Sequence, residues 1–158
     1  MPFFNTYFGK LVYTFLISMV PIIELRAAVP IAYSSGVNIF VAVAVSVIGN
    51  ILPVPFIIIF IKKIFAFIRK IMPKLDSFVT RLEERAEKKS DVVKKYAFWG
   101  LFILVAIPLP GTGAWTGALV AAFLEMKLKD AFPAIALGVV CAGIIVAFIT
   151  CGAGAIFS

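Results

Sequence analysis

The sequence predicts an all-α integral membrane protein made of an inverted repeat. Each half holds a re-entrant helical hairpin plus a transmembrane helix, and a cytoplasmic amphipathic helix lies between the halves. Of the 158 residues, 63% are hydrophobic, and the mean hydropathy is +1.10, so the chain lacks the polar residues that cover a water-soluble surface. Proline interrupts an apolar stretch in each half, and most basic residues lie in one central segment. We expect a single membrane domain over residues 1–158, with repeat 1 at 11–68, the connector at 69–95 and repeat 2 at 96–157.

The first apolar stretch is too short to cross a bilayer in one piece. It runs from Leu11 to Ile23 and is followed by Glu24, and at about 1.5 Å per residue it covers roughly 20 Å of the ~30 Å hydrocarbon core. If the chain turns at Glu24, it returns to the surface after Tyr33, and Pro21 and Pro30 shape the hairpin. The alternative is one tilted span from Leu11 to Tyr33 that is kinked at Pro21 and holds Glu24 near mid-bilayer.

A full-length span follows from Ile39 to Ile61, and this length crosses a bilayer with some tilt. Gly49-Asn50 and the prolines at positions 53 and 55 interrupt the stretch, which predicts a kink there. Lys62 and Lys63 mark the cytoplasmic end of this span.

The basic residues are concentrated in the centre of the chain. Eleven of the fifteen are Lys62, Lys63, Arg69, Lys70, Lys74, Arg81, Arg85, Lys88, Lys89, Lys94 and Lys95. By the positive-inside rule, the loop from Lys62 to Lys95 is cytoplasmic, and the protein is a multi-pass protein of the cell (inner) membrane. Acidic residues are interleaved with the basic ones and membrane segments flank them, which argues against nucleic acid as a partner.

Residues 74–95 have the periodicity of an amphipathic helix. Leu75, Phe78, Val79, Leu82 and Ala86 fall on one side of it, and charged residues fall on the other. We expect this helix to lie on the inner leaflet, where its lysines and arginines face anionic head groups. Membrane lipids are therefore expected partners.

The second half repeats the plan of the first. A short apolar arm leads into the motif Ile-Pro-Leu-Pro-Gly-Thr-Gly-Ala-Trp at residues 107–115, which is followed by a returning arm over 114–124 and a last span from Ala131 to Phe157. Two prolines and two glycines do not fit an uninterrupted helix. Non-helical backbone at membrane depth persists where protein or a water-filled cavity satisfies its peptide groups, so this break is expected to line a path or a binding site.

One full crossing separates the two hairpins, so the first is expected to enter from outside and the second from the cytoplasm. Both termini are then extracytoplasmic. Paired interrupted segments of this kind indicate a transport site near the bilayer midplane. Small residues spaced four apart allow close helix packing in both parts of the second half; they are Gly113, Gly117, Ala121, Ala134, Gly138 and Ala142.

Glu24 and Arg26 are the candidate proton-coupling residues. Glu24 is the one carboxylate of the first hairpin, and the second hairpin has none before Glu125. A buried carboxyl beside a cation can titrate in a useful range, so Glu24 can carry a proton. The alternative is a static ion pair that braces the hairpin.

An anionic substrate fits the same region. The returning arms are expected to begin at Ala27 and near Gly113, and helix N-termini favour anions. Thr112 offers a hydroxyl, and Trp115 offers either a flat surface for an apolar group or a packing contact. The expected substrate-binding residues are Arg26, Pro108, Pro110, Gly111, Thr112, Gly113 and Trp115.

The sequence gives no sign of an enzyme. It has no histidine, no Gly-x-Ser-x-Gly and no cluster with metal-ligand spacing, and its two cysteines, Cys141 and Cys151, lie in the last apolar run. We therefore expect no catalytic residue, no metal and no cofactor.

Two motifs carry a resemblance to a known family. Glu24-Leu25-Arg26 with a following Pro30, and the run from Pro108 to Trp115, resemble the signature of the small multidrug export protein family of bacteria and archaea. That family is distantly similar to the DedA superfamily, which also has two facing re-entrant hairpins, and whose second hairpin usually carries arginines that this chain lacks between Tyr96 and Glu125. The resemblance covers nearly the whole chain and implies a small inner-membrane transporter.

We therefore expect a small transporter or flippase, coupled to protons, that moves an amphipathic, anionic substrate such as a lipid phosphate or a small drug-like molecule. The alternative is a non-transport membrane scaffold or assembly protein whose hairpins are structural. Two full spans and two hairpins make a thin wall around any cavity, so we also expect a homodimer or a higher homo-oligomer.

Overall fold

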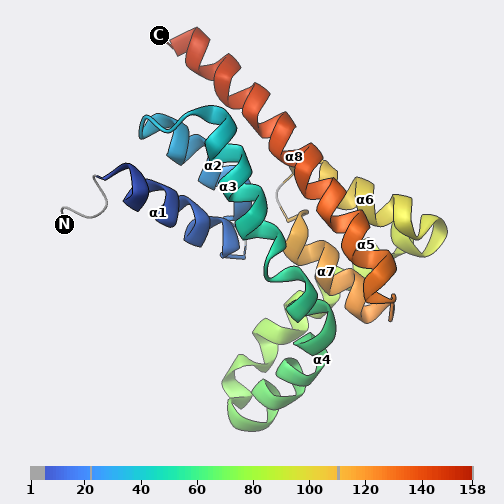
Figure 1. Cartoon of the computed structure of the whole chain (residues 1–158). Coiled ribbons are helices and arrows are strands. Elements are labelled where there is room, and N and C mark those ends of the chain that lie inside the picture. The colour runs from blue at the N-terminus through green and yellow to red at the C-terminus, as the bar shows by residue number, and fades with distance from the viewer. Residues whose placement is uncertain (1–5, 22, 110, 158) are drawn as a thin grey trace.

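The computed structural model describes residues 6–21, 23–109 and 111–157, and its regular elements over these residues are helical. The elements, shown in Figure 1, are α1 (Tyr7–Met19), α2 (Glu24–Ser34), α3 (Ile39–Ile51), α4 (Val54–Ile71), a 3-10 turn at Pro73–Leu75, α5 (Asp76–Tyr96), α6 (Phe98–Ala106), α7 (Ala114–Phe123) and α8 (Leu128–Phe157). The all-helical part of the predicted fold class is thus confirmed.

The first apolar stretch forms a hairpin. The helix α1 ends at Met19, the chain reverses, and α2 packs back along α1 and against α3. The prediction of a hairpin is therefore confirmed, and the alternative of one tilted span is wrong. The returning helix begins at Glu24 and not at Ala27 as expected. Glu24, its first residue, has a left-handed φ of 50°.

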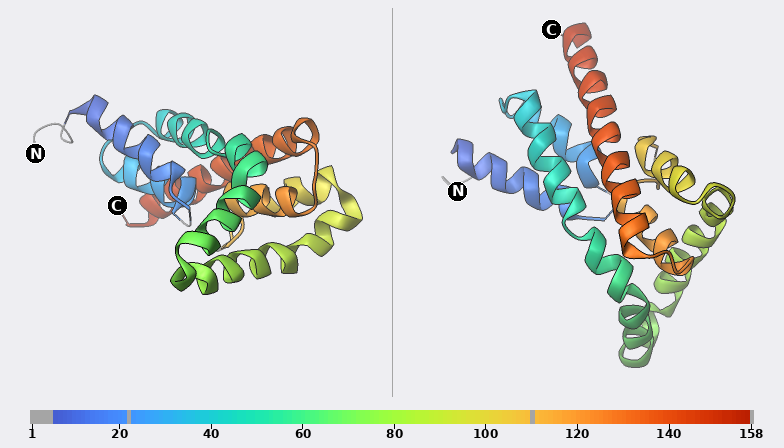
Figure 2. Two further views of the ribbon diagram at one scale, coloured as in Figure 1. Left: turned by 90° about the horizontal axis from the view of Figure 1, so that it is seen from below. Right: turned by 45° about the vertical axis from the view of Figure 1, so that its right-hand side comes forward.

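The second interrupted stretch also divides into two short helices. The helix α6 ends at Ala106, and α7 begins at Ala114 after the break at 107–113. Figures 1 and 2 show the two hairpins with their turns facing one another near the centre of the molecule and their open ends directed apart.

Two long helical segments are apolar enough to cross a membrane. They are Ile39–Ile71, with a mean hydropathy of 2.4, and Leu128–Ala153, with a mean hydropathy of 2.7. The first is the pair α3 and α4, which meet at the Leu52-Pro53 step, so the predicted kink is confirmed. The helix does not end at Lys62 but continues to Ile71.

The connector helix α5 packs against the second hairpin. It runs back from the end of α4 and contacts α6 and α7, as both views in Figure 2 show. Of the five residues predicted to share one apolar side, Val79 and Ala86 are fully buried and Leu82 is partly buried. Leu75 and Phe78 are exposed, so the protein covers the predicted apolar side only in part. Protein covers the apolar side of α5 at Val79 and Ala86, and those residues do not lie on the leaflet as expected.

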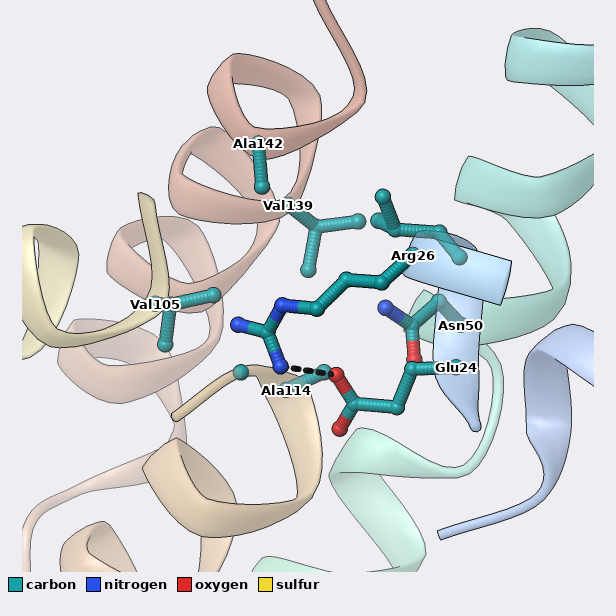
Figure 3. A pocket seen from close by; sticks show the side chains of 9 residues that line it. Glu24, Arg26, Asn50, Val105, Ala114, Val139 and Ala142 are labelled. Carbon is teal, nitrogen blue, oxygen red and sulfur yellow. Dashed lines mark hydrogen bonds and ion pairs between the residues drawn. The ribbon is translucent and has the colours of Figure 1, made fainter. Parts of the chain in front are cut away.

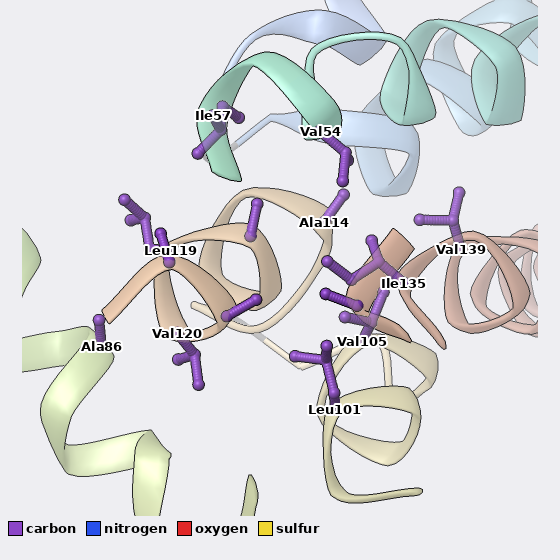
Figure 4. Close-up of a cluster of buried hydrophobic side chains, with 14 of the residues drawn as sticks. Val54, Ile57, Ala86, Leu101, Val105, Ala114, Leu119, Val120, Ile135 and Val139 are labelled. Carbon is purple, nitrogen blue, oxygen red and sulfur yellow. The ribbon is translucent and has the colours of Figure 1, made fainter. Parts of the chain in front are cut away.

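The main core lies where α4, α6, α7 and α8 meet (Figure 4). Small residues let these helices approach closely: a Cβ added to Gly117 would lie 2.5 Å from Val105 Cγ2, and one added to Gly138 would lie 2.7 Å from Val105 Cβ. A side chain at either position would push the helices apart. The predicted role of the small residues in packing is confirmed at these two contacts.

Candidate functional site

The carboxylate of Glu24 is buried where the two hairpin turns meet. Glu24 is 2% exposed, and its Oε1 accepts a hydrogen bond from the Trp115 backbone N–H at 3.1 Å. The carboxylate also accepts a hydrogen bond from the backbone N–H of Ala114, the first residue of α7. The first amides of a helix lack partners within the helix and carry its positive end. Glu24 therefore caps α7 across the interface between the hairpins.

Arg26 binds the backbone of the opposite turn. Its Nη1 lies 3.3 Å from Glu24 Oε2 and also donates to the carbonyl of Thr112. Its Nη2 donates to Thr112 Oγ1 at 2.8 Å and to the carbonyl of Ile107 at 3.3 Å. One guanidinium thus fixes both ends of the broken segment, which suits its planar fork of donors. The carboxylate holds the start of α7, and the guanidinium holds the turn before it.

Gly113 allows this close approach. Its φ of +123° is a conformation that residues with a side chain rarely adopt. A Cβ built there would lie 2.8 Å from Glu24 Cδ and 2.9 Å from Arg26 Nη1. Glycine is therefore required both by the backbone conformation and by the position of the Glu24–Arg26 ion pair.

Trp115 ties the two hairpins together a second time. Its indole Nε1–H donates to the backbone carbonyl of Met19 at 3.0 Å, at the end of α1. That carbonyl lies at a helix C-terminus, where partners within the helix are missing. The side chain is partly buried and packs on the main core, as the packing interpretation expects.

The structure brings together five of the predicted site residues, Glu24, Arg26, Thr112, Gly113 and Trp115. Pro108 lies in the second turn, and Pro110 falls outside the described residues. Gly111 is exposed, with a φ of +76°, and its carbonyl accepts hydrogen bonds from Lys89 and Thr116.

The two hairpin-forming prolines have different places. Pro21 lies in the turn after α1, as predicted, whereas Pro30 lies inside α2. Pro30 thus belongs to the returning arm of the hairpin and not to its turn. The expectation of an anion at the start of α7 also needs correction, because Glu24 occupies that position from within the chain.

Two further residues at the site were not predicted. Asn50 is 1% exposed at the end of α3, and with Glu24 and Arg26 it lines a narrow space (Figure 3). A polar residue in an apolar span is the available signal, but beside Gly49 and Pro53 it indicates a kink rather than a site. Lys89 of α5 donates from Nζ to the Gly111 carbonyl at 2.8 Å. Nothing distinguishes it in sequence from its basic neighbours.

Three buried polar atoms of α2 and α3 have no hydrogen-bond partner among the described residues: Arg26 Nε, Asn50 Oδ1 and Ser46 Oγ. Leaving a buried donor or acceptor unpaired costs about 1–3 kcal/mol. The Arg26 and Asn50 atoms belong to residues that line the same narrow space. The described residues form no group of three or more histidine, cysteine or acidic side chains that could hold a metal ion.

Comparison with known proteins identifies the family. Among curated proteins and solved structures, none matches the chain significantly. The family model described as "Putative small multi-drug export protein" matches residues 24–145, a range that begins at the site carboxylate and includes the second hairpin turn. With its two helices long and apolar enough to cross a membrane and its family of export proteins, this chain is a membrane protein. It belongs to the small multi-drug export protein family.

Proposed function

We propose that this protein is a proton-coupled transporter or flippase that moves an amphipathic, anionic molecule across the inner membrane. The observation that carries the proposal is the ion pair of Glu24 and Arg26, which is buried between two hairpin turns and binds both of them. Buried charges are costly in lipid and in most cases serve transport or proton relay.

The proton has a defined structural effect in this proposal. Protonation of Glu24 removes the charge that Arg26 and the start of α7 stabilise, so the contact between the turns weakens. The turns then part, and Arg26 becomes available to an anion. Release of the anion and of the proton restores the ion pair. Each state thus exposes the site differently, as alternating access requires.

The packing of the two halves supports an inverted repeat. In the first half, the first hairpin arm α1 packs on α3 at Gly49, where an added Cβ would lie 2.7 Å from the Phe15 carbonyl oxygen. In the second half, α6 packs on α8 at Gly138, where an added Cβ would lie 3.0 Å from the Phe102 carbonyl oxygen. Across the halves, α2 contacts α8 and α7 contacts α4. This reciprocity is what two facing hairpins from opposite membrane faces would produce.

Labelling of single cysteines tests that topology. In a background where Cys141 and Cys151 are replaced by serine, a cysteine at Ser35 is expected to react with an impermeant maleimide from outside, and a cysteine at Lys88 only from inside. Both positions are exposed, so access to the reagent depends on the membrane. Reaction of both from the same side would contradict hairpins that enter from opposite faces.

A Glu24→Gln variant tests the proton site. The protein is reconstituted in liposomes that contain a pH dye, and uptake of a fluorescent organic anion is measured with and without an imposed pH gradient. We expect the pH gradient to stimulate uptake by the wild-type protein. In the variant, this stimulation should be at least about tenfold smaller, which corresponds to about 1.4 kcal/mol. Glu125→Gln is the matched control, because Glu125 is exposed and pairs with Lys62.

The control should keep the wild-type response, and a thermal unfolding curve should show that the Glu24 variant is folded. Unchanged gradient dependence in a folded Glu24 variant would remove this residue from the mechanism. A wild-type protein with no flux of anion or proton would favour the second candidate, a scaffold in which the same ion pair is a static brace between the hairpins.

A further inference from the structure

Asn50 is placed in the site by the break between α3 and α4. It lies at the end of α3, next to Gly49, where α1 approaches closely. It is 1% exposed, and its Oδ1 has no partner in the part of the chain that the structure describes. Figure 3 shows its side chain beside those of Glu24 and Arg26.

Arg26 has one donor left at the same place. Its Nη1 and Nη2 are engaged by Glu24, Thr112 and Ile107. Its Nε is buried, and no described residue accepts its hydrogen. Among the described residues, Arg26 Nε–H is therefore an unpaired cationic donor and Asn50 Oδ1 is an unpaired acceptor, and both residues line the space.

These two atoms define what would bind between them. An acceptor that carries negative charge satisfies Arg26 Nε–H, and a hydroxyl hydrogen satisfies Asn50 Oδ1. We propose that Asn50 and Arg26 form a subsite for an oxyanion head group that retains a hydroxyl hydrogen, and that Asn50 selects such groups over oxyanions without one. This inference rests on the proposed function and specifies its substrate class.

The opposite wall of the space is apolar. The first arm of each hairpin packs on the long helix of its own half at a glycine: α1 packs on α3 at Gly49, and α6 packs on α8 at Gly138. The residue that follows each glycine is Asn50 on α3 and Val139 on α8. Asn50 and Val139 therefore hold equivalent positions in the two halves, and both line the space. Val105 and Ala142 extend the apolar wall. A polar wall that faces an apolar wall fits a head group joined to an apolar body.

The size of the space limits what part of a substrate it holds. Its empty volume is at most about 150 Å³, whereas pockets for whole drug-sized molecules have about 300–1,000 Å³. In this conformation the side chains lie so close together that the space does not admit a water molecule. A head group would therefore bind when the two turns part, and pairing of the two buried atoms would favour that open state.

Inorganic phosphate and sulfate are the probes that test the subsite. At neutral pH phosphate carries at least one P–OH, whereas sulfate has no hydrogen to donate. We expect the purified protein in detergent, at constant ionic strength, to bind phosphate on the order of tenfold more tightly than sulfate by calorimetry, which is the preference that one hydrogen bond to a buried, otherwise unpaired acceptor provides. Octyl phosphate against inorganic phosphate separates two sources of the ligand: tighter binding of the octyl ester indicates a lipid-like molecule, and equal binding indicates the free ion.

Asn50→Leu is expected to reduce the phosphate-to-sulfate preference to about one, because leucine offers no acceptor. Ser46→Ala is the matched control: Ser46 is fully buried one turn earlier on α3 and its Oγ is also unpaired, but it does not line the space. That variant should keep the preference. Equal wild-type affinity for the two ions, or a preserved preference in Asn50→Leu, would overturn the proposal; if Asn50→Leu does not fold, the wild-type ratio decides alone.

This binding measurement requires neither a pH gradient nor flux, so its outcome can be told apart from that of the transport experiment. A phosphate preference with no gradient-driven flux would retain the subsite and reject the transport mechanism. Gradient-driven flux without a preference for phosphate would retain the transport mechanism and reject the subsite.

Discussion

The two hairpin turns meet at the same place, but they contribute different chemistry. The first turn, at residues 20–23, is short, and the helix that follows it supplies the side chains of Glu24 and Arg26. The second turn, at residues 107–113, is longer and has no charged residue; it supplies backbone carbonyls, and the start of α7 that follows it supplies backbone amides. At this interface, the first hairpin therefore contributes charged side chains, and the second contributes peptide groups that have no partner within a helix.

This difference explains why each side needs the other. The broken backbone of the second hairpin has donors and acceptors that a helix would otherwise satisfy, and lipid cannot satisfy them. The two opposite charges of the first hairpin bind part of these donors and acceptors: the carboxylate accepts from the amides of α7, and the guanidinium donates to the carbonyls of Ile107 and Thr112. Changes to the two sides should therefore have different sizes.

The largest effect is expected on the charged side. Arg26→Ala removes the hydrogen bonds to the opposite turn and leaves the Glu24 carboxylate buried without its cation. Breaking one partner of a buried ion pair costs about 3–5 kcal/mol, so we expect a large fall in the midpoint of unfolding in detergent. Arg81→Ala, at an exposed position on α5, should leave the midpoint nearly unchanged. A loss no larger than that of this control would show that the charged pair does not hold the turns together.

A smaller effect is expected on the backbone side. Gly113→Ala forces a side chain into a left-handed conformation and toward the Glu24 carboxylate, and such strain costs about 1–3 kcal/mol. Gly152→Ala is the matched control, because an added Cβ there meets nothing within 4 Å. Alanine has the better helix propensity, so the control should be neutral or stabilising by up to ~1 kcal/mol. Equal unfolding midpoints for the two variants would contradict the packing role of Gly113.

Sequence patterns were sufficient to predict the two hairpins. Thirteen apolar residues before Glu24 and the proline- and glycine-rich break at 107–113 are local features, and helix length and backbone chemistry determine their structure. The pairing of Glu24 with Arg26 could also be predicted, since these are the charges of the first hairpin. The starting residue of α2 was three positions off, because a left-handed glutamate is an unusual helix start.

Long-range contacts could not be predicted in the same way. Lys89 contacts Gly111 because α5 packs on α6 and α7, and a periodic apolar stripe is the same whether lipid or protein covers it. Leu75 and Phe78 share that stripe but are exposed, whereas Val79 and Ala86 are buried. Asn50 has a similar explanation, because the residues that line the narrow space with it come from α2, α6, α7 and α8 and not from its own helix.

The smallest predicted effect connects the charged side to the connector helix through Lys89. Partial burial lowers the pKa of Lys89 below its usual value, and the charges of Arg26 and Arg85 lower it further. Protonated Lys89 is thus disfavoured in the folded protein, and its unfavourable contribution to stability is relieved as the pH rises from the lowered pKa toward the usual one.

An amine-reactive reagent measures this directly, because the neutral amine is the reactive form. The pH midpoint for labelling of Lys89, read by mass spectrometry with the exposed Lys88 as the internal reference, should lie below the usual lysine value of about 10.4. Arg26→Gln removes one of the two neighbouring charges, so the midpoint should rise, whereas Arg81→Gln should leave it in place. A midpoint that does not respond to Arg26 would mean that the connector helix does not sense the charge between the hairpins. A shift toward the usual value would show that a change at the buried ion pair reaches the connector helix electrostatically, across the backbone turn that both cations bind.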